Sequence, residues 1–274
     1  MNNYPSLIRL ATFTAFAIAA AMTSVQSAPV IKYSFEGNLN DTAASGSVLD
    51  NLSYNQGVSL SGIPQYGPGV GGGLAAVFDG NWFQAPDSID ADIADNTWAM
   101  ETFLKVSVHN GQWERLLVKW GTNNNYHLSL ETRDLNFFTG NPVGNVFDRN
   151  TAPVTNFTDG SWHHVAFTSS ATGSQAWIDG FSVFTGAPVT LLDGTDPLGI
   201  GDFGTPGANN GLRMHGFMDE ILIHDTPIDQ AYINGRVALI PEPSSGSLLL
   251  IATLGAGLAC RRRCGKFAPS FIGG

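Results

Sequence analysis

The sequence predicts an all-β protein, built as a sandwich of two antiparallel sheets. Three observations favour this fold class. Short runs of alternating polar and apolar residues recur along the chain, turn-forming Gly, Asn, Asp and Pro separate them, and no long stretch has the period of an amphipathic helix. Residues 28–240 form one predicted domain, which is long enough for a complete sandwich core.

The clearest pair of strands lies in residues 161–180. Alternation in its first strand gives one face to Trp162, His164 and Ala166, and the other face to His163, Val165 and Phe167. A polar turn at residues 169–173 ends in glycine, and the second strand at residues 175–178 runs into Asp179 and Gly180, a strong turn signal. The segment therefore predicts a β-hairpin.

The other elements follow the same reasoning along the chain. We predict strands at residues 30–35, 74–78, 82–85, 98–106, 115–119, 126–130, 135–138, 162–168, 175–178 and 217–224. Residues 64–73 and 202–211 are rich in glycine and proline and predict loops. A short closing helix is predicted at residues 229–236, because Pro227 and Asp229 suit a helix start.

The first 27 residues have the features of a secretory signal peptide. Arg9 precedes an apolar run at residues 10–22, and small residues surround Ser27, after which we expect cleavage. A buried core helix is the alternative, but the run has no polar face. The protein is therefore predicted to be exported.

Residues 241–274 form a second special segment. Pro241, Glu242 and Pro243 precede an apolar run, and the Arg cluster at residues 261–263 follows it. The positive end agrees with a cytoplasmic location. The apolar run of roughly 13 residues is shorter than the roughly 20 that a stable membrane helix needs. We therefore favour a transient membrane contact over the alternative, a permanent anchor.

This segment resembles the PEP-CTERM sorting tails of exported bacterial proteins. The resemblance implies that sorting machinery of the exosortase type recognises Pro241, Glu242 and Pro243, and that the apolar helix enters the membrane. It also implies delivery to the cell envelope or extracellular matrix of a Gram-negative-type bacterium. One feature departs from the pattern, because residues 264–274 follow the Arg cluster.

The domain resembles the laminin-G-like jelly rolls of the concanavalin A-like lectin/glucanase group. The segment Trp-His-His-Val-Ala, a turn and Trp-Ile-Asp-Gly is similar to the central hairpin of that family. Further similar pieces stand in the family's order at residues 33–41, 78–80, 85–88, 97–101 and 217–221. The resemblance implies a jelly-roll sandwich, but a fold alone does not determine function.

The charge and cysteine content of the chain limit the kinds of partner that it can bind. The formal net charge is −10, and no basic patch is present outside the tail, which argues against nucleic acid. Acidic polysaccharides would be repelled unless cations bridged them, whereas divalent cations would be attracted. Cys260 and Cys264 both lie in the tail, so no disulfide is expected in the domain.

Asp219 is the strongest single metal candidate. Strand alternation places it on the same face as Phe217, Ile221 and Ile223, where a carboxylate must be paired or coordinated. Backbone N–H groups of a neighbouring loop are one possible partner. A structural Ca²⁺ ion is the other, and the resemblance supports it. The further ligands of such an ion would be backbone carbonyls near Glu36 and Asn38 and near Asp79 and Gly80.

Two other groups of polar residues are weaker candidates. The loop with Asp87, Asp90, Asp92 and Asp95 lacks the pattern of an EF-hand, so a solvated connector is favoured over a calcium site. His163 and His164 face opposite ways and cannot hold one metal together. We expect one to be a core histidine bonded to backbone and the other to lie on the sheet surface.

No catalytic residue is predicted. Glu131 and Asp134 lie three positions apart, and Asp219 and Glu220 are adjacent, so neither pair shares a strand face as glycosidase carboxylates must. The Gly-x-Ser-x-Gly motif is also absent. The sequence therefore favours a protein that is not an enzyme.

Glycan binding needs aromatic faces beside planar polar groups, and one loop supplies both. The predicted ligand-binding residues are Trp120, Asn123, Asn124, Asn125 and Tyr126. The alternative is that these aromatic residues belong to the core. The leading hypothesis is an exported, non-catalytic jelly-roll domain that binds a glycan or a protein surface. A structural matrix protein without a specific ligand and a polysaccharide-active enzyme are the alternatives.

Overall fold

A computed structural model describes residues 28–44, 51–55, 63–88, 90–93, 95–106, 113–120, 125–131, 134–140, 143–148, 157–202 and 213–241. The predicted signal peptide and the tail beyond Pro241 lie outside these residues. None of the helices in the described segments is long and apolar enough to cross a membrane.

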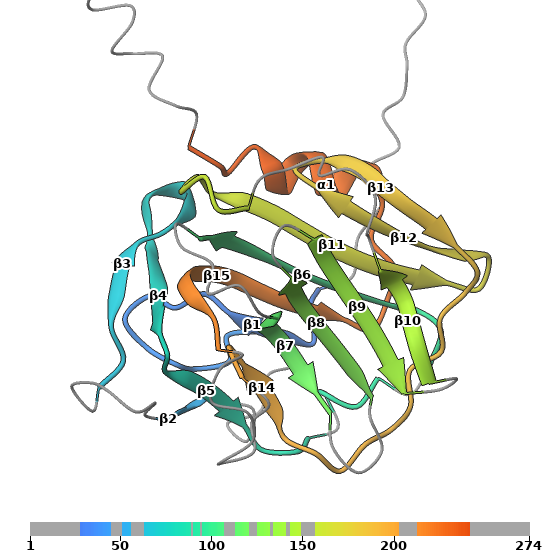
Figure 1. Cartoon of the computed structure of the whole chain (residues 1–274), viewed down its shortest axis with the longest axis horizontal. Helices are drawn as coiled ribbons and strands as arrows, with labels where there is room; N and C mark the ends of the chain where they lie inside the picture. Colours follow the sequence, from blue (N-terminus) through green and yellow to red (C-terminus); the bar gives the residue numbers. More distant parts are fainter. Residues whose placement is uncertain are drawn as a thin grey trace, which may run out of the picture.

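The described chain folds into two facing antiparallel sheets with one α-helix, as the sequence predicts (Figure 1). In the eight-stranded sheet the order is β13 (Phe181–Gly186), β12 (Gly173–Ile178), β11 (His163–Ser170), β6 (Trp98–Lys105), β15 (His215–His224), β4 (Leu74–Asp79) and β3 (Tyr66–Pro68), with β1 (Ile31–Tyr33) beside β15. In the seven-stranded sheet it is β10 (Val143–Asp148), β9 (Asp134–Gly140), β8 (Tyr126–Glu131), β7 (Trp113–Lys119), β14 (Leu198–Ile200), β5 (Trp82–Ala85) and β2 (Ser53–Asn55).

The main core fills the space between the sheets. Strand alternation turns Val165 and Phe167 of β11 inward, and Phe167 stacks on Phe137 of the opposite sheet with 4.6 Å between ring centroids. Phe137 also stacks on Trp98 at 5.2 Å. The alternation predicted for the central hairpin is therefore confirmed.

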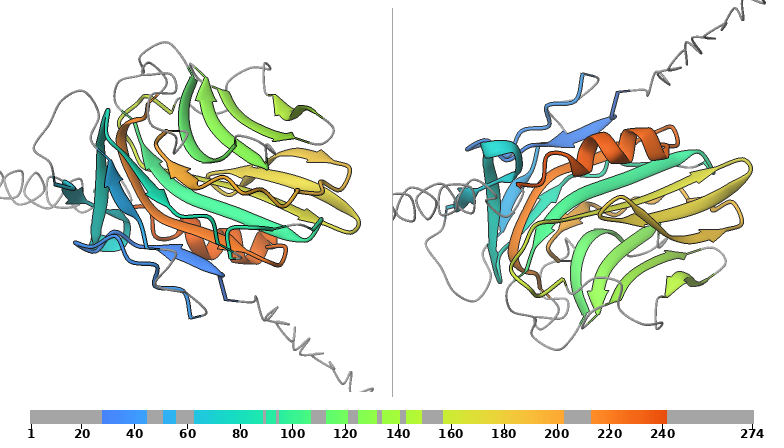
Figure 2. Two further views of the ribbon diagram at one scale, coloured as in Figure 1. Left: turned by 90° about the horizontal axis from the view of Figure 1, so that it is seen from below. Right: turned by 90° about the horizontal axis from the view of Figure 1, so that it is seen from above.

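Helix α1 (Gln230–Val237) covers part of the outer face of the eight-stranded sheet (Figure 2). The side chain of Asp229 caps it by accepting the N–H of Tyr232 at 2.8 Å. Ile233 packs on a second apolar cluster that includes Trp177, whose indole N–H donates to Gln230 at 3.1 Å. The predicted closing helix is confirmed.

A β-bulge interrupts β15 at Asp219. The register between β15 and β6 shifts between Asp219 and Leu222, and Glu220 has a φ of 48°. Phe217 therefore belongs to an outer cluster, whereas Ile221 and Ile223 belong to the main core. The prediction that Asp219 shares a face with Ile221 and Ile223 was wrong, because the bulge switches the faces of the strand.

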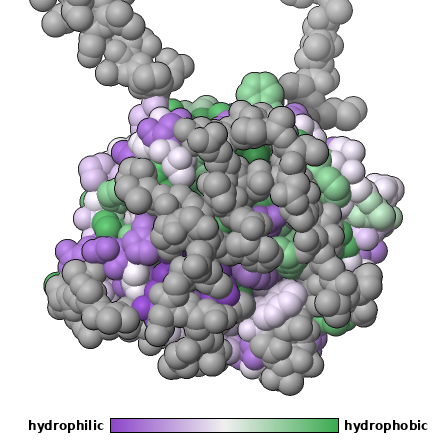
Figure 3. Space-filling model, in the orientation of Figure 1, coloured by the Kyte–Doolittle hydropathy of each residue, from purple (hydrophilic) through white to green (hydrophobic). Residues whose placement is uncertain are grey.

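The coloured surface in Figure 3 is a patchwork of hydrophilic and hydrophobic residues over the face that the view presents. On the coloured part of this face, residues of one kind do not gather into a broad patch that would mark a binding surface.

Candidate functional site

The central hairpin holds His163 between two carboxylates. Its Nδ1 lies 2.8 Å from Oδ2 of Asp179, and its Nε2 lies 3.1 Å from Oδ1 of Asp159. Burial by itself would lower the pKa of His163, but the hydrogen bonds and charges of Asp179 and Asp159 raise it above 6.5. The turn residue Asp179 thus has a second role, because its carboxylate pairs with the ring of His163.

His164 lies on the opposite face of β11, completely buried beneath α1. Its Nε2 is 2.7 Å from Glu101, which also accepts the hydroxyl of Tyr232 at 2.6 Å and Nε of Arg236 at 3.2 Å. Burial opposes the charge of Glu101, but hydrogen bonds from His164 and His224 and the charge of Arg236 lower its pKa.

The expectation of one backbone-bonded core histidine and one surface histidine was therefore wrong. His163 and His164 are 6% and 0% exposed, and both are bound to carboxylates. Glu101 lies 63 residues from His164, so the hairpin sequence could not identify it as a partner. Asp159 and Asp179 lie 4 and 16 residues from His163, but alternation alone does not show that they contact its ring.

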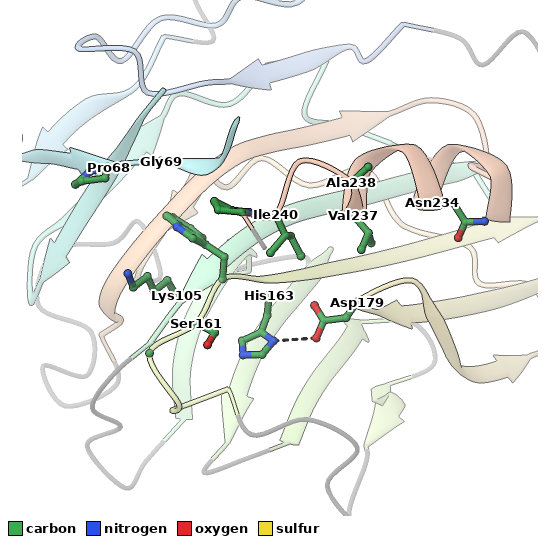
Figure 4. Close-up of a pocket in the computed structure, with 13 residues that line it drawn as sticks. Pro68, Gly69, Lys105, Ser161, His163, Asp179, Asn234, Val237, Ala238 and Ile240 are labelled. Atoms are coloured by element: carbon green, nitrogen blue, oxygen red, sulfur yellow. Dashed lines mark hydrogen bonds and ion pairs between the residues drawn. The ribbon is translucent and has the colours of Figure 1, made fainter. Parts of the chain in front are cut away.

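A pocket of about 1010 Å³ opens at the carboxyl end of α1, above His163 (Figure 4). Five separate segments build it, and its lining consists of Pro68, Gly69, Lys105, Gly160, Ser161, Trp162, His163, Asp179, Asn234, Val237, Ala238, Ile240 and Pro241. Figure 4 shows Lys105 and Asn234 toward opposite ends of the lining, with His163 and Asp179 facing each other between them.

The lining combines an apolar wall with a few polar groups. Val237 and Ile240 belong to the apolar wall, and Trp162 packs edge-on against Phe217 at 6.2 Å between centroids. Ser161 and Asn234 are exposed and present a hydroxyl and an amide. A concave, partly apolar surface with a few polar groups is typical of small-molecule and saccharide sites.

The described residues of the predicted ligand-binding segment lie elsewhere, where β7 ends and β8 begins in the seven-stranded sheet. Trp120 is half-buried, with its ring 5.9 Å from that of His127. Asn125 and Tyr126 are 1% and 0% exposed. Asn123 and Asn124 lie outside the described residues. The pocket and this loop do not share a residue, and ligand binding at the loop stays a prediction.

The outer face of the seven-stranded sheet carries polar side chains that are buried but not satisfied. Ser129 of β8 stands directly opposite Asn136 of β9. Both are at most 1% exposed, as is Asn125. Within the described part of the chain, the hydroxyl of Ser129 and the amides of Asn125 and Asn136 have no hydrogen-bond partner. Buried groups of this kind are rare and call for an explanation.

Asp219 uses backbone N–H groups, one of the two predicted alternatives. Its Oδ2 accepts from Val70 at 2.9 Å and its Oδ1 from Glu220 at 2.8 Å. Burial raises the pKa of Asp219 from 3.8 to about 7, the charges of Glu220 and Glu36 add to this, and the two N–H groups oppose it.

The other predicted calcium ligands also have partners. Glu36 accepts the N–H of Leu74 at 3.1 Å, Asn38 accepts that of Asn40 at 3.0 Å, and the Gly80 carbonyl accepts from Arg213 at 3.0 Å. The side chain of Asn81 accepts the N–H of Asp79 at 2.6 Å.

The hydrogen bonds of the Asp219 carboxylate come from backbone N–H groups. In the described segments, no three His, Cys, Asp or Glu side chains come together as a metal site. These N–H groups stabilise the carboxylate form of Asp219. No step below depends on calcium, which stays a prediction.

Two aspartates of the acidic loop have a role that sequence reasoning missed. Asp87 and Asp92 form ion pairs with the ammonium of Lys119, at 2.5 and 2.9 Å. The Lys119 side chain is fully buried, so these carboxylates offset the cost of burying its charge. The loop is therefore not only a solvated connector.

Comparison with known proteins assigns the family. Residues 79–234 match the family model Laminin_G_3, described as the concanavalin A-like lectin/glucanases superfamily. The match covers more than half of the chain, which therefore belongs to this family. A search of curated proteins finds no match.

The fold is also similar to solved structures. One is domain 4 of AbnA, a GH43 extracellular arabinanase from Geobacillus stearothermophilus in complex with arabinotriose, with a TM-score of 0.57, 17% identity and coverage of 77% of this chain and 98% of that chain. Another is the binding domain of Paraclostridial Mosquitocidal Protein 1, with a TM-score of 0.57, 12% identity and coverage of 77% and 52%.

A third is the binding domain of botulinum neurotoxin DC in complex with rat synaptotagmin II, with a TM-score of 0.53, 11% identity and coverage of 78% and 52%. The chain thus spans about half of each of the two toxin domains. At these identities the likeness shows the fold alone.

Proposed function

We propose that the protein is an exported, non-catalytic domain that binds a glycan in the pocket at the carboxyl end of α1. The pocket itself is the observation that carries the proposal, because it is large, concave and lined by both apolar and hydrogen-bonding groups. The arabinanase domain, solved with arabinotriose, supports a saccharide as the ligand class.

The lining suits the two surfaces of a sugar ring. The apolar C–H face of a ring can lie against Trp162, Val237 and Ile240. Its hydroxyl groups can reach Ser161 and Asn234, which offer both donors and acceptors. The volume exceeds that of one sugar unit, so a short stretch of a glycan chain is the expected ligand.

The hydrogen-bond partners of His163 favour a binding role over a catalytic one. A general base needs a free nitrogen, whereas both ring nitrogens of His163 face carboxylates. Asp179 is the carboxylate among the described lining residues, and it already holds His163 and the backbone N–H of His164. A glycosidase needs two carboxyl groups free to act on the substrate.

Export and sorting form part of the proposal and rest on the ends of the sequence. The signal peptide would direct export. Sorting machinery of the exosortase type would recognise the motif that begins at Pro241, which lies at the rim of the pocket. The domain would then reach the cell envelope or extracellular matrix, where a glycan ligand is available.

A second location is favoured by a specific observation. The unsatisfied polar groups of Asn125, Ser129 and Asn136 form a polar strip on the seven-stranded sheet, next to the loop predicted from the sequence. Ligand hydroxyls or ordered waters reaching this strip would satisfy them. The strip is buried in this structure, so the open pocket is the preferred site.

A glycan array with the purified protein tests the proposal. We expect a saturable hit whose affinity falls about ten-fold in the double variant Ser161→Ala/Asn234→Ala, because two exposed hydrogen-bonding groups are lost. The matched control is Thr172→Ala/Gln175→Ala, which changes two exposed polar residues of the β11–β12 hairpin. Melting curves verify that both variants fold.

Three results would contradict this assignment. No saturable hit would favour a structural matrix protein without a ligand. Equal loss in both double variants would exclude the pocket as the site. Release of reducing ends from a polysaccharide would show an enzyme.

A further inference from the structure

Lys105 differs from the other basic residues that the structure describes. Each of the others forms an ion pair with a carboxylate: Lys32, Arg115, Lys119, Arg213 and Arg236. In the described part of the chain, Lys105 has no such pair. Its ammonium lies 5.8 Å from the ring centroid of Phe217. A cation left unpaired in a chain of net charge −10 requires a reason.

The position of Lys105 in the pocket provides a reason for this unpaired charge. It is the last residue of β6, it is half-buried, and its side chain lines the pocket. Figure 4 shows it in the lining with Ser161 and His163. A ligand that fills this end of the pocket would therefore lie beside the Lys105 side chain.

The other charged groups at the pocket contact one another and do not pair with Lys105. Asp179 and Asp159 both contact His163, and their hydrogen bonds favour its protonated form. Both carboxylates therefore have His163 as their partner at the pocket, and in the described part of the chain neither forms an ion pair with Lys105. Lys105 is the lining cation with which an acidic group of a ligand can pair.

We propose that the glycan bound in this pocket carries a single carboxylate on one sugar ring, as in a uronic acid unit, and that this carboxylate pairs with Lys105. The inference rests on the proposed function and names its ligand class. One ammonium balances one unit of negative charge, whereas a phosphate would bring more charge than Lys105 can match. The acidic surface of the protein disfavours a polyanion.

Isothermal titration with two disaccharides tests this inference. The first probe is glucuronic acid linked to a neutral sugar, and the second is the same disaccharide with glucose in place of glucuronic acid. We expect the acidic probe to bind about ten-fold more tightly, because its carboxylate adds a charge-assisted hydrogen bond. Polygalacturonate, a polyanion, is a third probe and should bind more weakly per site than the acidic disaccharide.

Variants of Lys105 test whether its charge causes the tighter binding of the acidic probe. Lys105→Gln should abolish the preference for the acidic probe and leave the neutral probe unaffected, and Lys105→Arg should retain the preference. Lys32→Gln, which removes a lysine of β1 outside the pocket, is the matched control and should bind as the wild type does. Melting curves verify folding.

The outcomes separate the two proposals. If both disaccharides bind equally and Ser161→Ala/Asn234→Ala weakens both, the role of Lys105 is overturned, but the pocket remains the binding site. A preference for the acidic probe that survives in Lys105→Gln would overturn it too. Binding of neither probe, nor of any glycan on the array, would overturn the proposed function itself.

Discussion

The outer faces of the two sheets bury polar side chains in opposite ways. Beneath α1, Glu101 of the eight-stranded sheet meets His164, Tyr232 and Arg236, all within 3.2 Å. On the seven-stranded sheet, Ser129 and Asn136 are buried to the same degree, but their side-chain polar groups have no hydrogen-bond partner among the residues that the structure describes. Hydrogen bonds and ion pairs within the fold account for the burial of the Glu101 cluster, but they do not account for the burial of Ser129 and Asn136.

The difference between the two faces distinguishes buried polar residues that stabilise the fold from those that have another role. A buried polar network stabilises the fold only when its members are satisfied, because each unsatisfied group costs roughly 1–3 kcal/mol. The Glu101 cluster docks α1, which in turn forms one wall of the pocket. The strip on the other sheet lowers stability unless a ligand or water reaches it.

The largest effect is expected from breaking the satisfied cluster. Glu101→Gln removes the negative charge that faces Arg236 and the two histidines, and should lower the free energy of unfolding by about 3–5 kcal/mol. Urea denaturation followed by circular dichroism measures it. Glu220→Gln, whose carboxylate is partly exposed beside Arg236, is the control and should cost less than about 1 kcal/mol. Equal losses would remove the special role of the buried cluster.

An intermediate effect is expected from the pH dependence of Asp219. Burial raises its pKa to about 7, so between about pH 4 and pH 7 the folded protein holds a proton that the unfolded chain has released. Its contribution to stability is therefore present below this range and is lost as the pH rises through it. Asp219→Asn should flatten the fall in unfolding free energy between pH 5 and pH 8, as urea denaturation at each pH would show.

Two results would change that account. An unchanged pH slope in Asp219→Asn would assign the proton to another group. A wild-type melting temperature that falls when EDTA is added at pH 8 would show that calcium holds the ionised carboxylate, as the sequence led us to expect. An unchanged melting curve would remove the calcium site.

The smallest effect is expected on the unsatisfied strip. Asn136→Leu replaces a buried amide without partners by an apolar side chain of similar size, so stability should stay within about 1 kcal/mol of the wild type or rise. Thermal melting measures it. A loss above about 2 kcal/mol would show that the amide is bonded after all. Loss of glycan binding with retained stability would move the ligand site to this sheet.

The sequence predicted the layout of the fold because strand alternation and turn residues are local signals. The central hairpin and the helix start at Asp229 are examples. The prediction omitted β2, β3, β10, β13 and β14. Short strands such as β2, β3 and β14 contain three residues each, too few for alternation to be recognised, and pairing with neighbours defines them.

The candidate site could not be predicted in the same way. Its pocket joins residues from Pro68 to Pro241, so only tertiary structure brings Lys105, Ser161 and Asn234 together. Glu101, the partner of His164, lies 63 residues away, whereas Asp159 and Asp179, the partners of His163, lie 4 and 16 residues away. The bulge at Asp219 left no local signal, because Glu220 adopts a positive φ that its residue type does not favour.

The most direct test of the central claim is an NMR titration of the ¹⁵N-labelled protein with the best glycan from the array. The account predicts that the largest chemical-shift changes occur at the pocket, in Lys105, Ser161, Trp162 and Asn234, while Ser129 and Asn136 change little. Changes confined to Ser129, Asn136 and their neighbours on the seven-stranded sheet would contradict it.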